Sequence, residues 1–124
     1  MSGVVYKTIR HMLGTGTLVT WDGQGKVDAA VVRTQPCRVV RMFGTNTSGS
    51  ARYIQIHDAT SAPANTAVPA LPAVAVAAGA SFNLDLGFDG VQLANGVVVA
   101  SSTTSDTLTL TGAADLLVAV TTLT

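Results

Sequence analysis

The sequence predicts an all-β protein, an antiparallel β-sandwich of jelly-roll-like type with an extended N-terminal arm or hairpin. Short segments in which apolar and polar residues alternate recur between Arg52 and the C-terminus, and alternation with a period of two is typical of strands that bury one face. Aromatic residues make up only 5% of the chain, so the core must be built from aliphatic side chains, and its β-branched members favour sheets. No segment shows the 3.6-residue period of a helix.

Residues 1–36 are expected to form an arm and a hairpin. Residues 1–16 lack the alternating pattern and are predicted to be extended, with a hinge at residues 14–16. Residues 17–21 and 27–33 are predicted to pair as a hairpin, because the Asp-Gly-Gln-Gly sequence between them is a turn signal. The alternative for residues 27–33 is a short helical piece through Ala29 and Ala30.

Residues 37–124 are expected to form the sandwich domain. Residues 38–43 and 52–57 are predicted to be strands that pair as a hairpin, with the two isoleucines of the second strand facing the core. The Ala- and Pro-rich residues 58–72 are expected to be a loop or a sheet edge, because proline has no backbone N–H to donate.

Further short strands separated by turns are predicted in the rest of the chain. Glycine-containing turns fall between most of them, and the last two are expected to be joined by a turn at residues 112–114. A spacing of about 8–12 residues between strands is typical of a sandwich. The predicted strands are residues 73–77, 82–86, 91–93, 97–100, 107–111 and 116–122.

Charged residues are scarce and unevenly distributed. They make up 11% of the chain, against about 25% in typical soluble domains, and a sparsely charged surface favours lasting association. Residues 1–52 carry seven cations and two Asp (+5), whereas residues 53–124 carry five Asp and no cation (−5). Either the two parts interleave in the fold and neutralise each other, or the molecule has a basic and an acidic end suited to head-to-tail docking.

The sequence contains no motif that indicates catalysis or a cofactor. Its single cysteine, Cys37, lies in an apolar run and is expected to be a small core residue. The two histidines are far apart in sequence, and Asp85 and Asp89 are expected to serve turn geometry rather than calcium binding. Neither a GxSxG motif nor a P-loop occurs. We therefore predict a protein that is not an enzyme and binds no cofactor or metal.

Membrane and secretory roles are not predicted. The N-terminus lacks the apolar region of a secretory signal, and prolines and a glycine interrupt the longest apolar run, residues 67–80. The sequence Asn46-Thr47-Ser48 matches a glycosylation sequon, but without a secretory signal it is interpreted as a polar turn.

Basic residues are the candidate partner contacts. Arg38 and Arg41 would fall on opposite faces of an ideal strand and few aromatic residues lie nearby, which disfavours direct contact with nucleic acid. Bridges from these arginines to carboxylates of a neighbouring subunit are the preferred interpretation. The predicted contact residues are Lys7, Arg10, Arg33, Arg38 and Arg41.

Residues 40–122 resemble a pattern of turns and apolar positions found in small virion proteins of tailed bacteriophages. Residues 1–39 lie outside the resemblance. The segments that carry it are Phe43-Gly44-Thr45-Asn46, residues 52–59, Pro63-Ala64, Val68-Pro69, residues 79–87 and residues 90–103.

The resemblance implies a β-sandwich that is assembled into a particle, and it transfers no catalytic residue. The leading expectation is a capsid decoration (cement) protein, assembled in the host cytoplasm into the virion. It would form a homo-oligomer, a trimer, and would bind the major capsid protein or other virion subunits on the outside of the head. The alternatives are a neck, tail or fibre component of the same virion, or a sandwich module that binds host glycans.

Overall fold

The computed structural model describes the backbone of residues 5–11, 14–23 and 25–124, with side chains from Thr17 onward within these ranges. The described residues form ten strands and no helix, and every strand pairing among them is antiparallel. The strands are β1 (Val5–His11), β2 (Gly14–Asp22), β3 (Ala29–Arg33), β4 (Cys37–Asn46), β5 (Arg52–His57), β6 (Val74–Val76), β7 (Ser81–Asp85), β8 (Val91–Leu93), β9 (Val97–Ser102) and β10 (Leu116–Leu123).

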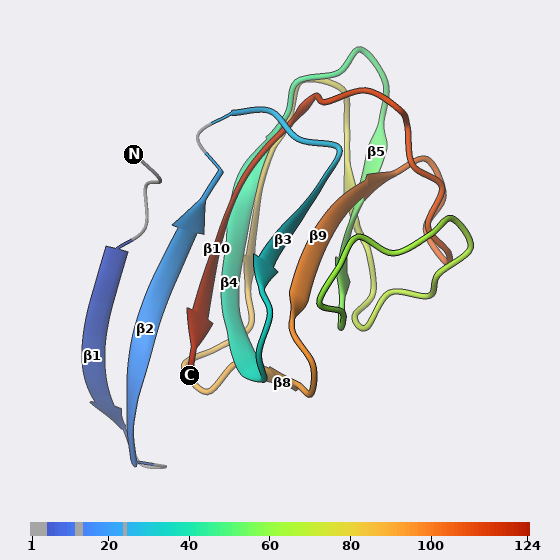
Figure 1. The fold of residues 1–124 in the computed structure, drawn as a ribbon. Coiled ribbons are helices and arrows are strands. Elements are labelled where there is room, and N and C mark those ends of the chain that lie inside the picture. The colour runs from blue at the N-terminus through green and yellow to red at the C-terminus, as the bar shows by residue number, and fades with distance from the viewer. Residues whose placement is uncertain (1–4, 12–13, 24) are drawn as a thin grey trace.

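The strands form two sheets that face one another, so the predicted β-sandwich is confirmed (Figure 1). Sheet A has the order β1-β2-β10-β4-β7. β8 also pairs with β4, at residues 37–39, whereas β7 pairs at residues 41–45. Sheet B has the order β3-β9-β5-β6. Met42 and Val120 from sheet A pack in one core with Ile54 and Ile56 from sheet B, and all four are almost completely buried. The isoleucines of β5 therefore face the core as predicted.

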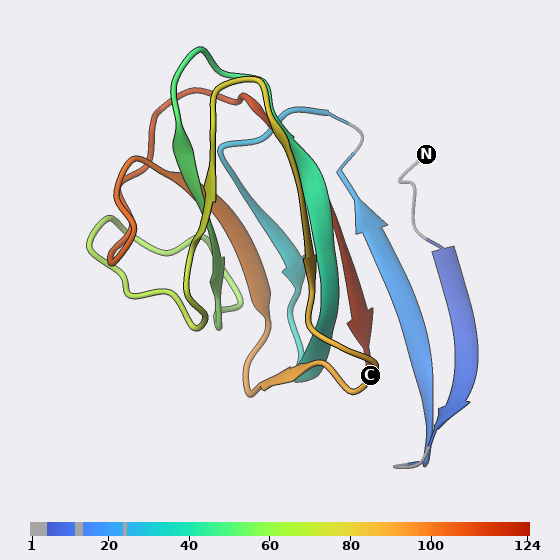
Figure 2. The same cartoon turned by 180° about the vertical axis from the view of Figure 1, so that it is seen from behind.

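Over β5 and β9, the outer face of sheet B is covered by the protein's own loops. Residues 58–72 and 103–111 pass over the side of sheet B that faces away from sheet A (Figures 1 and 2), so the residues of β9 that face away from the core are buried as well as those that face it. The two segments are joined by backbone hydrogen bonds between Thr66 and Leu108 (2.8 Å) and between Leu108 and Ala67 (2.8 Å). Among the described residues, sheet A has no such cover over Arg41 and Phe43, which are exposed on its outer face.

Both predicted hairpins of the first 57 residues are wrong. β2 pairs with β10 in sheet A, whereas β3 pairs with β9 in sheet B. In the same way β4 lies in sheet A and β5 in sheet B. A turn signal marks where the chain reverses, but it does not decide whether the next strand lies alongside or crosses to the facing sheet. Here each of these two connections crosses between the layers.

The strand predicted at residues 107–111 is also wrong. The segment forms only an isolated bridge, between Ser102 and Leu110, and it does not pair with β10. Its backbone groups bond to the hydroxyl groups of residues 102 and 104 and to the backbone of residues 66, 67 and 103 instead of forming a ladder. The Thr104 hydroxyl donates to the Thr107 carbonyl (2.7 Å), and the Thr109 N–H donates to the Ser102 hydroxyl (2.9 Å).

The N-terminal part forms a hairpin of β1 and β2, paired from Val5 with Thr20 to His11 with Gly14. The expected hinge at residues 14–16 is wrong, since these residues belong to β2. Residues 1–4 of the expected arm, and Gln24 of the expected turn, lie outside the described residues. β2 lies in sheet A and β3 lies in sheet B. Both sheets therefore contain strands from residues 1–36 as well as strands from residues 37–124.

Candidate binding face on sheet A

The outer face of sheet A is built from cross-strand rows of outward-facing side chains. Asp22 pairs with Ala119, Ala119 with Phe43, and Phe43 with Asn83, so these four residues form one row across β2, β10, β4 and β7. Directly opposed residues of neighbouring strands share a face of the sheet. The registers place Thr20, Thr121 and Arg41 in the next row in the same way, and the alternate positions between the rows face the core.

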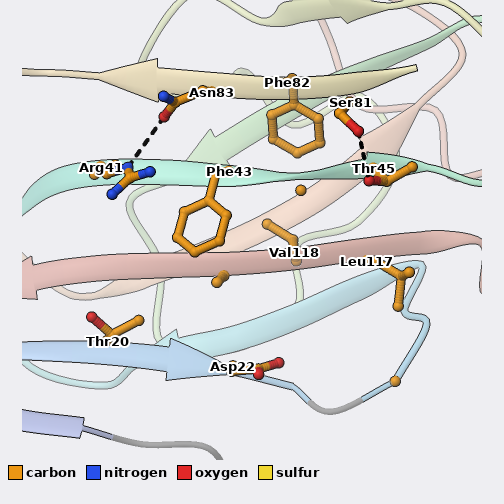
Figure 3. Close-up of a pocket in the computed structure, with 13 residues that line it drawn as sticks. Thr20, Asp22, Arg41, Phe43, Thr45, Ser81, Phe82, Asn83, Leu117 and Val118 are labelled. Atoms are coloured by element: carbon orange, nitrogen blue, oxygen red, sulfur yellow. Dashed lines mark hydrogen bonds between the residues drawn. The ribbon is translucent and has the colours of Figure 1, made fainter.

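A groove of about 680 Å³ lies over these rows (Figure 3). Ala119 is the smallest side chain of its row, so the floor of the groove is low between Asp22 and Phe43. Phe43 and Leu117 are 36% and 39% exposed and supply its apolar surface. The other lining residues are Thr20, Gly25, Arg41, Gly44, Thr45, Ser81, Phe82, Asn83 and Val118.

Short polar contacts hold the side chains of the groove. Arg41 Nε donates to Asn83 Oδ1 (3.2 Å), and the Arg41 guanidinium carbon lies 4.6 Å from the centre of the Phe43 ring. The hydroxyl groups of Thr45 and Ser81 are 3.0 Å apart. Arg41 is thus fixed both by an amide and by a cation–π contact, which restrains the aromatic ring beside it.

Arg38 and Arg41 face the same way, so the prediction that they lie on opposite faces is wrong. Thr121 pairs with Arg41 and the next residue of β10 pairs with Val39, which leaves Val40 as an extra residue in β4. This β-bulge resets the alternation, so Val39 and Met42 both face the core and both arginines face outward. Arg38 Nη1 donates to the Asp89 carbonyl (3.4 Å).

The other predicted contact residues lie elsewhere. Arg33 ends β3 in sheet B, on the opposite layer of the sandwich. Lys7 and Arg10 lie on β1, paired with Leu18 and Thr15, and their side chains are outside the described part of the structure. Of the five predicted residues, the structure therefore brings Arg38 and Arg41 together.

The basic and acidic parts of the sequence interleave. β4 from the basic part lies between β10 and β7 from the acidic part, and Arg41 is directly opposite Asp85. Arg52 Nη2 forms an ion pair with Asp115 Oδ2 (3.7 Å). The first of the two charge interpretations therefore describes the sandwich.

The buried histidine belongs to the contact between β5 and the covering loops. Gln55 Nε2 donates to the carbonyls of Thr104 (2.9 Å) and Thr107 (3.0 Å), which turns its Oε1 toward His57. This oxygen accepts a hydrogen bond from Nε2–H of His57 (2.9 Å). Burial lowers the pKa of His57, because the charged imidazolium would lose its hydration. Burial therefore favours the neutral form of His57, which links β5 to the covering loops through Gln55.

Cys37 and Asp58 also have structural roles. Burial raises the pKa of the Cys37 thiol against the opposing charge of Arg33, and the residue packs in the core as predicted. Burial alone would raise the pKa of Asp58, but the backbone N–H groups of residues 94–96 donate to its carboxylate and together lower the pKa. Asp58 thereby holds the turn between β8 and β9.

Two turn interpretations from the sequence agree with the structure. Asp85 Oδ1 accepts from the Gly87 N–H (2.9 Å), and Gly87 has a φ of 85°, which favours glycine. Asn46 ends β4 and is 1% exposed, and its amide is fully engaged with backbone carbonyls and Ser48, so the polar turn that follows leaves the sequon amide inaccessible.

Apart from Arg41, the sequence did not identify the groove residues. Phe43, Asn83 and Ala119 lie on three strands that are remote in the sequence. Their only sequence signal is that each occupies an outward position of an alternating segment, and the cross-strand register alone brings them together.

Comparison with protein-family models, curated proteins and solved structures found no match. Across the described ranges, no three His, Cys, Asp or Glu side chains are grouped in a way that would hold a metal ion. The same ranges contain no helix with the length and hydropathy needed to cross a bilayer.

Proposed function

We propose that this protein is a non-enzymatic structural component of a tailed-bacteriophage virion. Its role is that of a capsid decoration (cement) protein, which binds the outer surface of the head and stabilises contacts between major capsid subunits. The resemblance over residues 40–122, the sandwich fold and the low content of charged residues support the proposal. The protein assembles in the host cytoplasm as a homo-oligomer, a trimer, and stays in the virion.

The observation that carries the proposal is the edge strand β1. β1 pairs with β2 on one side, and no other strand of the described chain pairs with it. An open strand edge presents backbone N–H and C=O groups to which another chain can add a strand. β1 carries Lys7 and Arg10, and residues 5–21 contain no acidic residue, so the edge suits a capsid surface with carboxylates at its rim.

A trimer would present this edge once per subunit. Apolar area buried at each contact contributes about 25 cal/mol per Å². Contacts that are individually weak become lasting when the subunits are linked, because after the first contact forms the others bind at high effective concentration. Decoration therefore requires no covalent bond and no large interface for each copy.

The test is to delete residues 1–16 and to measure binding to purified heads that lack the protein. The deletion removes β1 and the first three residues of β2 but leaves the pairing of β2 with β10, because Thr17 exchanges backbone hydrogen bonds with Thr124 (3.2 and 3.1 Å) and Leu18 pairs with Leu123. We expect a folded protein that no longer binds heads. Undiminished binding would refute the role of β1.

Charge-reversal variants refine this test. K7E combined with R10E should weaken binding to heads, whereas K26E, at an exposed position beyond β2, should leave it unchanged. Equal effects of the two would point to non-specific attraction between charges.

The same edge would also serve a neck, tail or fibre component. Copy number in purified virions separates these roles. A decoration protein is present in amounts comparable to the major capsid protein, whereas a neck or tail component is present in only a few copies per particle.

A further inference from the structure

We infer that the groove on the outer face of sheet A binds an uncharged carbohydrate chain. This function is separate from binding to the head, which we assign to β1 at the edge of the sheet. The groove lies on the face of the same sheet, over β2, β10, β4 and β7 (Figure 3).

The dimensions of the groove suit a ligand of a few sugar units. Its volume, about 680 Å³, lies within the range of about 300–1,000 Å³ that is common for ligand sites. Ala119 leaves space between Asp22 and Phe43, and nothing in the described chain covers the outer face here as residues 58–72 and 103–111 cover sheet B.

The chemistry of the lining suits the two kinds of surface on a sugar ring. Phe43 offers an apolar surface to C–H groups, and Leu117 extends it. Asn83 and Arg41 offer amide and guanidinium groups to ring hydroxyls, which both donate and accept hydrogen bonds. Threonine and serine hydroxyls add further partners along the walls.

The charge of the lining points to an uncharged ligand. The groove contains one cation, Arg41, and one anion, Asp22. A polyanion such as a nucleic acid would need several cations on one surface. The two charges offset each other, so neither an acidic nor a basic polymer is favoured.

The mixture of side chains is less suited to a protein partner. The centre of a protein interface is apolar and poor in charged residues, and exposed patches that mark such sites cover several hundred Å². Here Phe43 and Leu117 are each little more than one third exposed and are surrounded by hydroxyl and amide groups.

The groove is also prepared before a ligand arrives. Arg41 is held by Asn83 and by the Phe43 ring, and Thr45 is held by Ser81. Side chains that are already ordered lose less conformational entropy on binding, which raises the affinity for a ligand that fits them.

The experiment is binding of the full chain to an array of neutral glycans, followed by calorimetry with the best ligand. Ala119→Leu fills the groove with a larger apolar side chain, and Phe43→Ala removes the aromatic wall. Each should lower affinity by about tenfold or more, equivalent to about 1.4 kcal/mol. The matched control is Phe88→Ala, which removes a 56% exposed aromatic residue outside the groove and should leave affinity unchanged.

Thermal denaturation identifies variants that fail to fold, and Ala119→Leu keeps the test valid if Phe43→Ala is unstable. Ala119→Leu should still bind heads, which separates this inference from the proposed function. The inference is overturned if no neutral glycan binds at millimolar concentration. It is also overturned if Phe88→Ala abolishes glycan binding while Ala119→Leu has no effect.

Discussion

Replacement of Asn46 by alanine tests whether a single buried amide joins the two sheets. Asn46 ends β4 in sheet A, and its Nδ2 donates to the carbonyls of Ser50 (2.9 Å), Val76 (3.2 Å) and Ala77 (3.2 Å). Val76 belongs to β6 of sheet B. On the other side of the amide, Asn46 Oδ1 accepts hydrogen bonds from the backbone N–H (3.0 Å) and the hydroxyl (2.7 Å) of Ser48.

The magnitude follows from these five contacts. Two N–H groups are shared among three carbonyls, and a hydrogen bond contributes about 1 kcal/mol net, so the loss of the amide should cost about 3–4 kcal/mol. That is a large fraction of the roughly 5–15 kcal/mol by which a domain is stable. Asn46→Asp should cost at least as much, because a carboxylate cannot donate to the three carbonyls.

Urea denaturation followed by circular dichroism measures the free energy of unfolding. The matched control is Asn83→Ala on the neighbouring strand, where the exposed amide makes one hydrogen bond, with Arg41, and the cost should stay within about 0.5 kcal/mol. A cost below 1 kcal/mol for Asn46→Ala, similar to that of Asn83→Ala, would refute the assignment of this amide as a link between the sheets.

Three further predictions concern buried positions. Burial lowers the pKa of His57 in the folded state, so at acidic pH the unfolded state binds more protons than the folded state. The free energy of unfolding should therefore fall as pH drops below the unfolded pKa of 6.5, and the part of this slope due to His57 should be absent in H57Q. Gly96→Ala should cost about 1–3 kcal/mol in urea denaturation, because a Cβ would lie within 2.6 Å of two backbone carbonyl oxygens, whereas Gly49→Ala, with nothing within 4 Å, should be nearly neutral. Cys37 should resist alkylation in the native protein and react once urea unfolds it; rapid native labelling would contradict its burial.

Several strands and their faces were predictable from local sequence. Alternation placed β5 and β7 within about a residue of their observed bounds and turned Ile54 and Ile56 inward. It succeeded because a strand with one buried face must repeat every two residues, whatever its neighbour is. The turns at residues 87–90 and 95–96 were also visible, because they contain glycine and polar residues.

The partners of the strands were not predictable in this way. β2 and β3 are adjacent in sequence and separated by a turn signal, yet their hydrogen bonds go to β10 and β9. The partner of a strand is set by contacts with segments that are far away in the sequence. Such long-range contacts leave no pattern within the strand itself. The same limit hid the bulge at Val40, which places Arg38 and Arg41 on one face.

The order of residues is enough to show that this chain builds strands, that aliphatic side chains fill its core and that its cations precede residue 53. Only the folded arrangement shows that loops cover β5 and β9 of sheet B, that no described loop covers Arg41 and Phe43 on sheet A, and that Phe43, Ala119 and Asn83 meet in one groove. The reason is physical: burial of alternate residues is specified within a few residues of chain, whereas a surface is created by registers between strands that lie far apart in the sequence.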